Sequence, residues 1–95
     1  LLSAVTNRQY EVATLLLAAK SDVNAKDSDG LTALMHAARQ GDLPMVTSLL
    51  EHGADVNARG LTTTSSLVYA VEGGHLDVVV ALLAEGATYS LAEMV

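Results

Sequence analysis

The chain contains no cysteine, no phenylalanine and no tryptophan, and each absence narrows what it can be. Without cysteine it has no disulfide framework, no thiol nucleophile and no zinc–thiolate site. Its only aromatic side chains are three tyrosines, so a core drawn from its apolar residues, 51% of the 95, must consist mainly of Leu, Val and Ala. Such small aliphatic side chains let helices approach one another closely.

Basic residues are also scarce: five Lys and Arg stand against eleven Asp and Glu, for a formal charge of −6. This balance argues against a nucleic-acid partner, which would need Lys and Arg to displace phosphate counterions. The longest apolar run, residues 78–84, covers about a third of the roughly 20 residues that a membrane-spanning helix needs. No signal peptide and no Asn-x-Ser/Thr acceptor is present. We expect an intracellular protein, cytoplasmic or nuclear, that does not insert into a membrane.

A repeat with a period of 33 residues dominates the chain. The Asp-Val-Asn-Ala segment at 22–25 returns at 55–58. Nine further positions return in the same way: Leu34, Ala37, Gly41, Leu43, Val46, Leu49, Leu50, Gly53 and Ala54 recur as Leu67, Ala70, Gly74, Leu76, Val79, Leu82, Leu83, Gly86 and Ala87. A fixed period of this length indicates stacked supersecondary units rather than one closed domain.

Each unit is expected to consist of a helix, a tight turn, a second helix and an extended loop. Residues 32–40 form the first helix of the central unit, and its second helix follows Asp42, with Pro44 in the first turn, and is ended by Gly53. The pattern predicts further helices at 11–19, 65–73 and 77–85. Their apolar stripes at i, i+3 and i+4 predict a common core. The residues expected to be buried are Leu16, Leu17, Val46, Leu49, Leu50, Val79, Leu82 and Leu83.

The central unit resembles an ankyrin repeat, whose pattern is a β-turn followed by two antiparallel helices. The residues that carry the resemblance are Asp27, Gly30, Thr32-Ala33-Leu34, Ala37-Ala38, Gly41, Val46, Leu49-Leu50 and Gly53-Ala54-Asp55-Val56-Asn57-Ala58. The resemblance implies an all-α ankyrin-repeat solenoid of helix-turn-helix units joined by β-hairpin-like loops. It divides the chain into a partial repeat at 1–26, full repeats at 27–59 and 60–92, and a start of a further unit or a tail at 93–95. Because Leu1 falls within a unit and is not Met, we expect a piece of a longer protein.

Departures from the family pattern predict local differences between the units. Met35 and Val68 stand where the family has a His that bonds the cap hydroxyl. Thr63 replaces the glycine of the hairpin tip, so that tip should differ or be strained. Arg8 and Lys20 replace two helix-closing glycines, and each costs roughly 1 kcal/mol if its backbone is left-handed.

Catalysis and metal binding have little support in the sequence. The Asp-x-Asp-Gly segment at 27–30 resembles part of a calcium loop, but Ala25 and His36 occupy its first and last ligand positions. His36 also lacks a second ligand at i+4, and His52 and His75 fit structural roles. We therefore expect no enzymatic activity, no cofactor and no metal.

Two functions remain. The resemblance implies a non-enzymatic module that binds a protein partner on the concave face, which hairpin tips and first helices form. The alternative is a structural or regulatory segment of a larger protein that contacts its own chain or self-associates. The partner-binding residues implied are Thr6, Asn7, Lys26, Ser28, Asp29, Leu31, Arg39, Gln40, Leu61, Thr62, Thr64 and Glu72.

Three expectations concern individual side chains. Leu31 and Leu61 would be exposed apolar anchors, unless they fold back onto neighbouring loops. Asn24 and Asn57 resemble the setting in which an asparaginyl hydroxylase modifies ankyrin proteins, unless each only bonds its own loop backbone. The apolar residues at both ends predict that the chain is only marginally stable. Upstream repeats, a swapped neighbour or self-association would cover these ends. The end residues are Leu1, Leu2, Leu91, Met94 and Val95.

Overall fold

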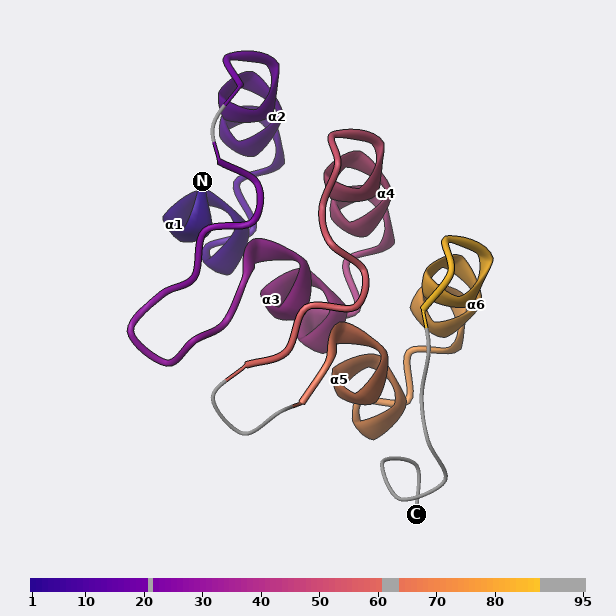
Figure 1. Ribbon diagram of the computed structural model, residues 1–95. Helices are drawn as coiled ribbons and strands as arrows, with labels where there is room; N and C mark the ends of the chain where they lie inside the picture. The colour runs from indigo at the N-terminus through magenta and orange to yellow at the C-terminus, as the bar shows by residue number, and fades with distance from the viewer. Residues whose placement is uncertain (21, 61–63, 88–95) are drawn as a thin grey trace.

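A computed structural model describes residues 1–20, 22–60 and 64–87. Over these ranges the chain forms six α-helices and no strand, arranged as three antiparallel pairs (Figure 1). The pairs are α1 (Leu2–Thr6) with α2 (Tyr10–Ala18), α3 (Ala33–Gln40) with α4 (Leu43–Glu51), and α5 (Ser66–Glu72) with α6 (Leu76–Ala84). The first helices of the pairs form an inner layer and the second helices an outer layer. The predicted all-α stack of three helix pairs is confirmed.

Local capping sets the helix boundaries. The Asp42 carboxylate accepts a hydrogen bond from the Met45 N–H at 3.3 Å and so begins α4. Gly41 closes α3 in the left-handed conformation, with φ 72°, where the lack of a Cβ removes the steric penalty. Because these signals are local, the helices predicted at 11–19, 32–40, 65–73 and 77–85 lie within one residue of the observed ones.

In the second unit, Met35 stands where the family has the histidine that bonds the cap hydroxyl, and it makes a different contact with Thr32. The Thr32 hydroxyl accepts from the Met35 N–H at 3.3 Å, while the Thr32 N–H donates to the Met35 thioether sulfur at 3.5 Å. The sulfur thus takes the part that a Glu or Gln side chain plays in a capping box. The equivalent hydroxyl of the third unit, on Ser65, is buried without a partner among the described residues.

The two departures at helix ends do adopt the left-handed backbone. Arg8 has φ 57° and Lys20 has φ 63°. Their equivalents one unit later, Gly41 and Gly53, also have positive φ. Arg8 and Lys20 therefore each carry the strain of roughly 1 kcal/mol expected of a residue with a Cβ. The loops before α3 and α5 are each bracketed by one antiparallel β-bridge, Lys26 to Thr32 and Arg59 to Ser65. Thr63 lies outside the described residues.

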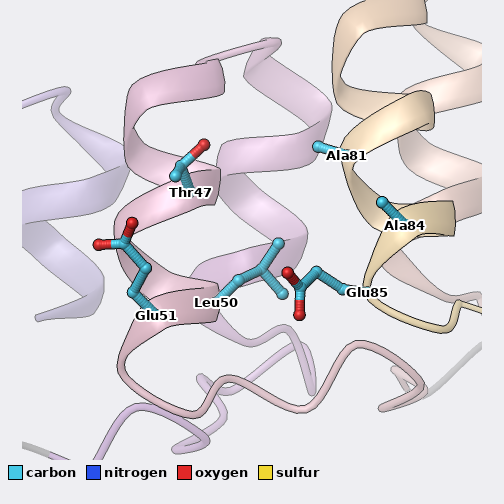
Figure 2. Close-up of a pocket in the computed structure, with 6 residues that line it drawn as sticks. All are labelled: Thr47, Leu50, Glu51, Ala81, Ala84 and Glu85. Carbon is cyan, nitrogen blue, oxygen red and sulfur yellow. The ribbon is translucent and has the colours of Figure 1, made fainter.

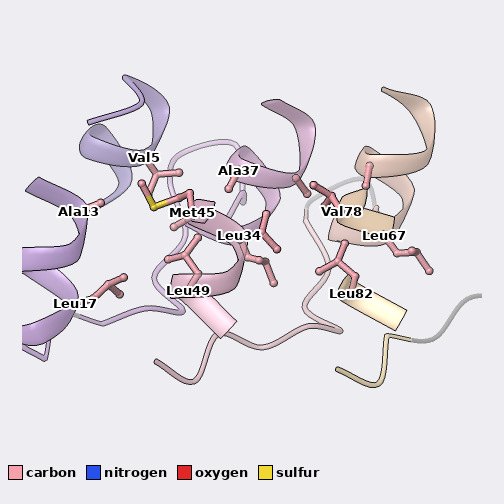
Figure 3. Close-up of a cluster of buried hydrophobic side chains, with 14 of the residues drawn as sticks. Val5, Ala13, Leu17, Leu34, Ala37, Met45, Leu49, Leu67, Val78 and Leu82 are labelled. Atoms are coloured by element: carbon pink, nitrogen blue, oxygen red, sulfur yellow. The ribbon is translucent and has the colours of Figure 1, made fainter. Parts of the chain in front are cut away.

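The core runs between the two helix layers through all three pairs (Figure 3). The apolar stripes of the outer helices point into it, as the i, i+3, i+4 pattern predicts. Four residues predicted to be buried are so: Leu17, Val46, Leu49 and Leu82. Leu1 and Leu2 of the first pair also pack against this core and are half-buried, whereas Leu91, Met94 and Val95 lie outside the described residues.

The prediction that Leu83 is buried is wrong. Leu83 is 43% exposed, although its equivalent one unit earlier, Leu50, is half-buried against the core. Leu16 and Val79 are also half-buried. The difference arises because the third pair covers the outer helix of the second, while within the described residues no helix pair lies beyond α6.

The stack predicts a large penalty for truncating its central leucine. Leu49 is fully buried, so Leu49→Ala should lower the free energy of unfolding by roughly 2–5 kcal/mol by leaving a cavity. Urea denaturation followed by circular dichroism measures the change. Leu83→Ala, the same substitution at an exposed position, is the matched control and should cost much less. Equal losses in the two variants would contradict the assignment of the core.

Candidate protein-interaction surface

The concave face is bounded by the inner helices α1, α3 and α5 and by loop 26–32, which projects from that layer, together with residues 59–60 and 64–65 (Figure 1). Helix α3 has little free surface of its own, because its residues 33–38 are all buried. The accessible side chains are found in loop 26–32 and at the C-terminal ends of α1, α3 and α5.

Most of the predicted partner-binding residues are accessible there. The exposed ones are Thr6, Asn7, Lys26, Ser28, Asp29, Arg39 and Glu72, and the half-buried ones are Gln40 and Thr64. Leu61 and Thr62 lie outside the described residues. The accessible set carries both signs of charge: Lys26 and Arg39 are basic, and Asp29 and Glu72 are acidic.

Leu31 is not the exposed anchor that we expected. It is only 8% exposed, which matches the alternative that it folds back onto a neighbouring loop. Its Cδ2 lies 3.4 Å from the position that a Cβ on Gly60 would occupy. Leu31 therefore packs beside Gly60 of the next loop.

Asp27 fixes the shape of the hairpin tip before α3. One carboxylate oxygen accepts from the N–H groups of Asp29 and Leu31, both at 2.9 Å. The other lies 2.7 Å from Nε2 of His36, on the first turns of α3. The calcium-like segment is thus a hydrogen-bonded turn anchored to a helix, and its central carboxylate is already fully used.

The hydrogen-bond partners of His36 determine its tautomer. Its Nδ1 lies 3.3 Å from a guanidinium nitrogen of Arg39, which can only donate, so Nδ1 accepts. Nε2 therefore carries the proton and donates it to Asp27. The pKa of the Asp27 carboxyl is lowered from its ordinary value of 3.8. The largest cause is this hydrogen bond from His36, and the hydrogen bond from the Leu31 backbone N–H comes second.

Tyr69 belongs to the same surface, although the sequence analysis did not single it out. The Arg39 guanidinium carbon lies 6.0 Å from the centre of the Tyr69 ring, at the limit of a cation–π contact. Tyr69 follows His36 by one period of 33 residues. The repeat was therefore the sequence signal that could have placed Tyr69 beside the His36–Arg39 pair.

Polar side chains tie neighbouring units together along this face. Gln40 donates from its amide to the Thr6 carbonyl at 2.9 Å, and Lys26 donates from Nζ to the Arg59 carbonyl at 3.0 Å. His75 donates from Nε2 to the Arg39 carbonyl at 3.0 Å. The inner edge of the stack is therefore braced by bonds that link one unit to the next.

The loop asparagines also bridge units. The Asn24 amide donates to the Gly53 carbonyl at 3.3 Å and accepts from the Asp55 N–H at 2.7 Å, and Asn57 donates to the Gly86 carbonyl at 3.3 Å. The structural alternative, in which each side chain bonds its own loop backbone, is therefore wrong in detail. These side chains bond the following loop.

The described residues contain no group of three or more His, Cys, Asp or Glu side chains that could hold a metal ion. His52 donates from Nδ1 to the Ser48 carbonyl at 2.7 Å and so caps the end of α4. No helix within the described ranges is long and apolar enough to span a bilayer.

Stacked helix pairs of 33 residues, with hairpin loops on one side, define a repeat solenoid with an extended binding surface. A family model described as ankyrin repeats, in three copies, matches residues 1–92. The chain therefore belongs to the ankyrin-repeat family, whose members are generally protein–protein interaction modules and typically lack enzymatic activity. A search among curated proteins finds no match. The repeat boundaries at 26/27 and 59/60 stay a prediction.

The bonds to Asp27 predict a measurable pH dependence. Because its pKa is lowered on folding, Asp27 stabilises the fold above pH 3.8, and this contribution is lost as the pH falls through the folded pKa. A carboxyl-carbon NMR titration should give a pKa below 3.8. His36→Leu, which has no donor, should raise that pKa toward 3.8, since it removes the hydrogen bond that is the largest cause. A wild-type pKa at or above 3.8 would contradict the hydrogen-bonding scheme.

Proposed function

We propose that this chain binds a protein partner through its concave face and performs no chemistry. The observation that carries the proposal is the set of exposed, mixed-charge side chains held on one face by a braced framework. The tip that presents Ser28 and Asp29 is fixed by the three bonds to Asp27. A surface ordered before binding loses less conformational entropy when its partner docks.

Arg39 and Tyr69 replace Leu31 as the anchor of this proposal. Arg39 is exposed and its neighbour Tyr69 half-buried, and side chains of these two types are enriched among the residues that dominate binding energies. The bond to His36 and the tyrosine ring orient the guanidinium. A partner carboxylate can pair with it in a planar, two-pronged geometry.

Charge reversal tests the concave face. Once a partner has been identified by cross-linking, Asp29→Lys with Glu72→Lys should slow association with a basic or mixed surface, because such charges act mainly on the association rate. Arg39→Ala should speed dissociation, at a cost of about 1 kcal/mol or more if it is an anchor. Surface plasmon resonance measures both rates.

Asp77→Lys, on the outer helix α6, is the control and should bind as the wild type does. Circular dichroism confirms that each variant folds. If all folded concave-face variants bind with unchanged rates, the partner uses another surface and the assignment is wrong.

A second function, contact with another copy or with its own chain, is favoured by apolar groups at both ends of the stack. Leu15 on α2 is 71% exposed and Leu76 on α6 is 75% exposed. Their equivalents in the central unit, Ser48 and Leu43, are buried and half-buried, because neighbouring helix pairs cover them. The end faces therefore match surfaces that the stack covers internally.

Sedimentation velocity tests this second function. If the ends associate, the sedimentation coefficient should rise with concentration, and Leu76→Glu should suppress the rise. Val80→Glu, on the same helix at an exposed position, should not, since its equivalent Thr47 is exposed within the stack. A chain that stays monomeric at all concentrations and melts at high temperature would contradict both this function and the expected marginal stability.

The resemblance to ankyrin proteins also supports a proposal about the loops. We propose that an asparaginyl hydroxylase modifies Asn24 and Asn57. Both residues are exposed, although their amides are bonded to the next loop. An enzyme would have to open these bridges before it reached the side chain. This proposal, like the proposed partner, presumes that the chain works in the cytoplasm or the nucleus.

A further inference from the structure

A groove of about 280 Å³ lies on the outer layer, between α4 and α6 (Figure 2). Figure 2 shows Leu50 and Glu85 pointing into the gap, with the two small side chains of α6 facing α4. Six residues line it: Thr47, Leu50, Glu51, Ala81, Ala84 and Glu85. The groove belongs to the face opposite the inner helices, so it is separate from the proposed concave site.

The lining combines an apolar floor with one glutamate from each wall. Leu50 is half-buried, and Ala81 and Ala84 extend no further than a Cβ, so the floor accepts a methylene chain. Glu85, at the end of α6, points into the gap, whereas the carboxylate of Glu51 is directed to the side of α4 away from α6 (Figure 2), and both residues are exposed. This is the complement of a Lys or Arg side chain, which has an aliphatic stem and a cationic head.

Neither α4 nor α6 contains Lys or Arg, so the two helices that wall the groove supply no permanently positive side chain to pair with those carboxylates. The hydrogen-bonded pair of His36 and Asp27 lies in the inner layer. The two carboxylates thus face solvent in a chain that is acidic overall, which favours attraction of a cation from outside.

The other junction between outer helices, α2 with α4, is an internal comparison. Shifting the groove residues back by 33 gives Thr14, Leu17, Ala18, Ser48, Glu51 and His52. Ala18 and His52 thus stand where the groove has its two carboxylates. Leu17 is covered, at 3% exposed, and Ser48 is bonded to the Tyr10 hydroxyl at 2.9 Å. The second junction therefore differs from the first in its more open leucine and in Glu85, which stands where the first junction has His52.

We propose that the α4–α6 groove is a binding site for a cationic side chain, Lys or Arg, of a partner protein. The stem packs on Leu50, Ala81 and Ala84, the head group pairs with the Glu85 carboxylate, and Glu51 on the opposite wall adds a second negative charge. The groove gives the chain a second contact surface, on the layer opposite the concave face. Binding at the groove does not require that the concave face binds a partner.

The test uses a minimal probe and its neutral counterpart. N-acetylarginine amide is titrated into the ¹⁵N-labelled chain, and N-acetylcitrulline amide, which keeps the shape but not the charge, is titrated in parallel. Arginine should cause saturable shifts of the amides of Thr47, Leu50, Ala81 and Ala84. Citrulline should cause much smaller ones at the same concentration.

Single variants Glu51→Gln and Glu85→Gln should each weaken the arginine probe roughly two- to fivefold, the range that one exposed ion pair supports. The double variant should remove the difference between the two probes. Glu72→Gln, which removes an exposed carboxylate from the inner helix α5, is the matched control and should leave the titration unchanged. Both groove glutamates are exposed, so these variants should keep the fold.

Equal shifts from arginine and citrulline, shifts confined to the concave face, or no saturable shift would each overturn the proposal. The two surfaces can be tested independently. Asp29→Lys with Glu72→Lys should leave the arginine titration intact even if the concave proposal fails, and the groove variants should leave concave-face binding intact.

Discussion

Everything in this structure depends on the burial of one helix pair against the next. A single pair exposes an apolar face on each side, and only a neighbour on both sides covers it. Leu49, in the central pair, is fully buried, whereas Leu83 and Leu76 of the last pair remain open to solvent. Position in the stack, more than residue type, decides which leucines form the core.

Polar bonds between the units supplement this packing. Asn24 and Lys26 each donate to a backbone carbonyl about one repeat later, whereas Gln40 and His75 each donate to a carbonyl about one repeat earlier. Most of these acceptors are carbonyls in loops or at helix ends, which the helices themselves leave without partners. The side chains that hold the loops in place are thus the ones that also fix the register between units.

Local signals made the helices predictable, and contacts between units made the surface harder to predict. Caps and glycines act within a few residues, so the ranges were right to one residue. Leu31 packs beside Gly60, almost one unit later, and no local pattern reveals that contact. The Arg39–Tyr69 contact and the α4–α6 groove likewise appear only when two units are placed side by side.

The left-handed residues of the first unit make its turns unlike those of the later units. Arg8 and Lys20 carry backbone strain at two positions where the central unit has glycine. Such strain lowers the free energy of local opening. Amide hydrogens in the turns after α1 and α2 should therefore exchange ahead of those in the turns after α3 and α4.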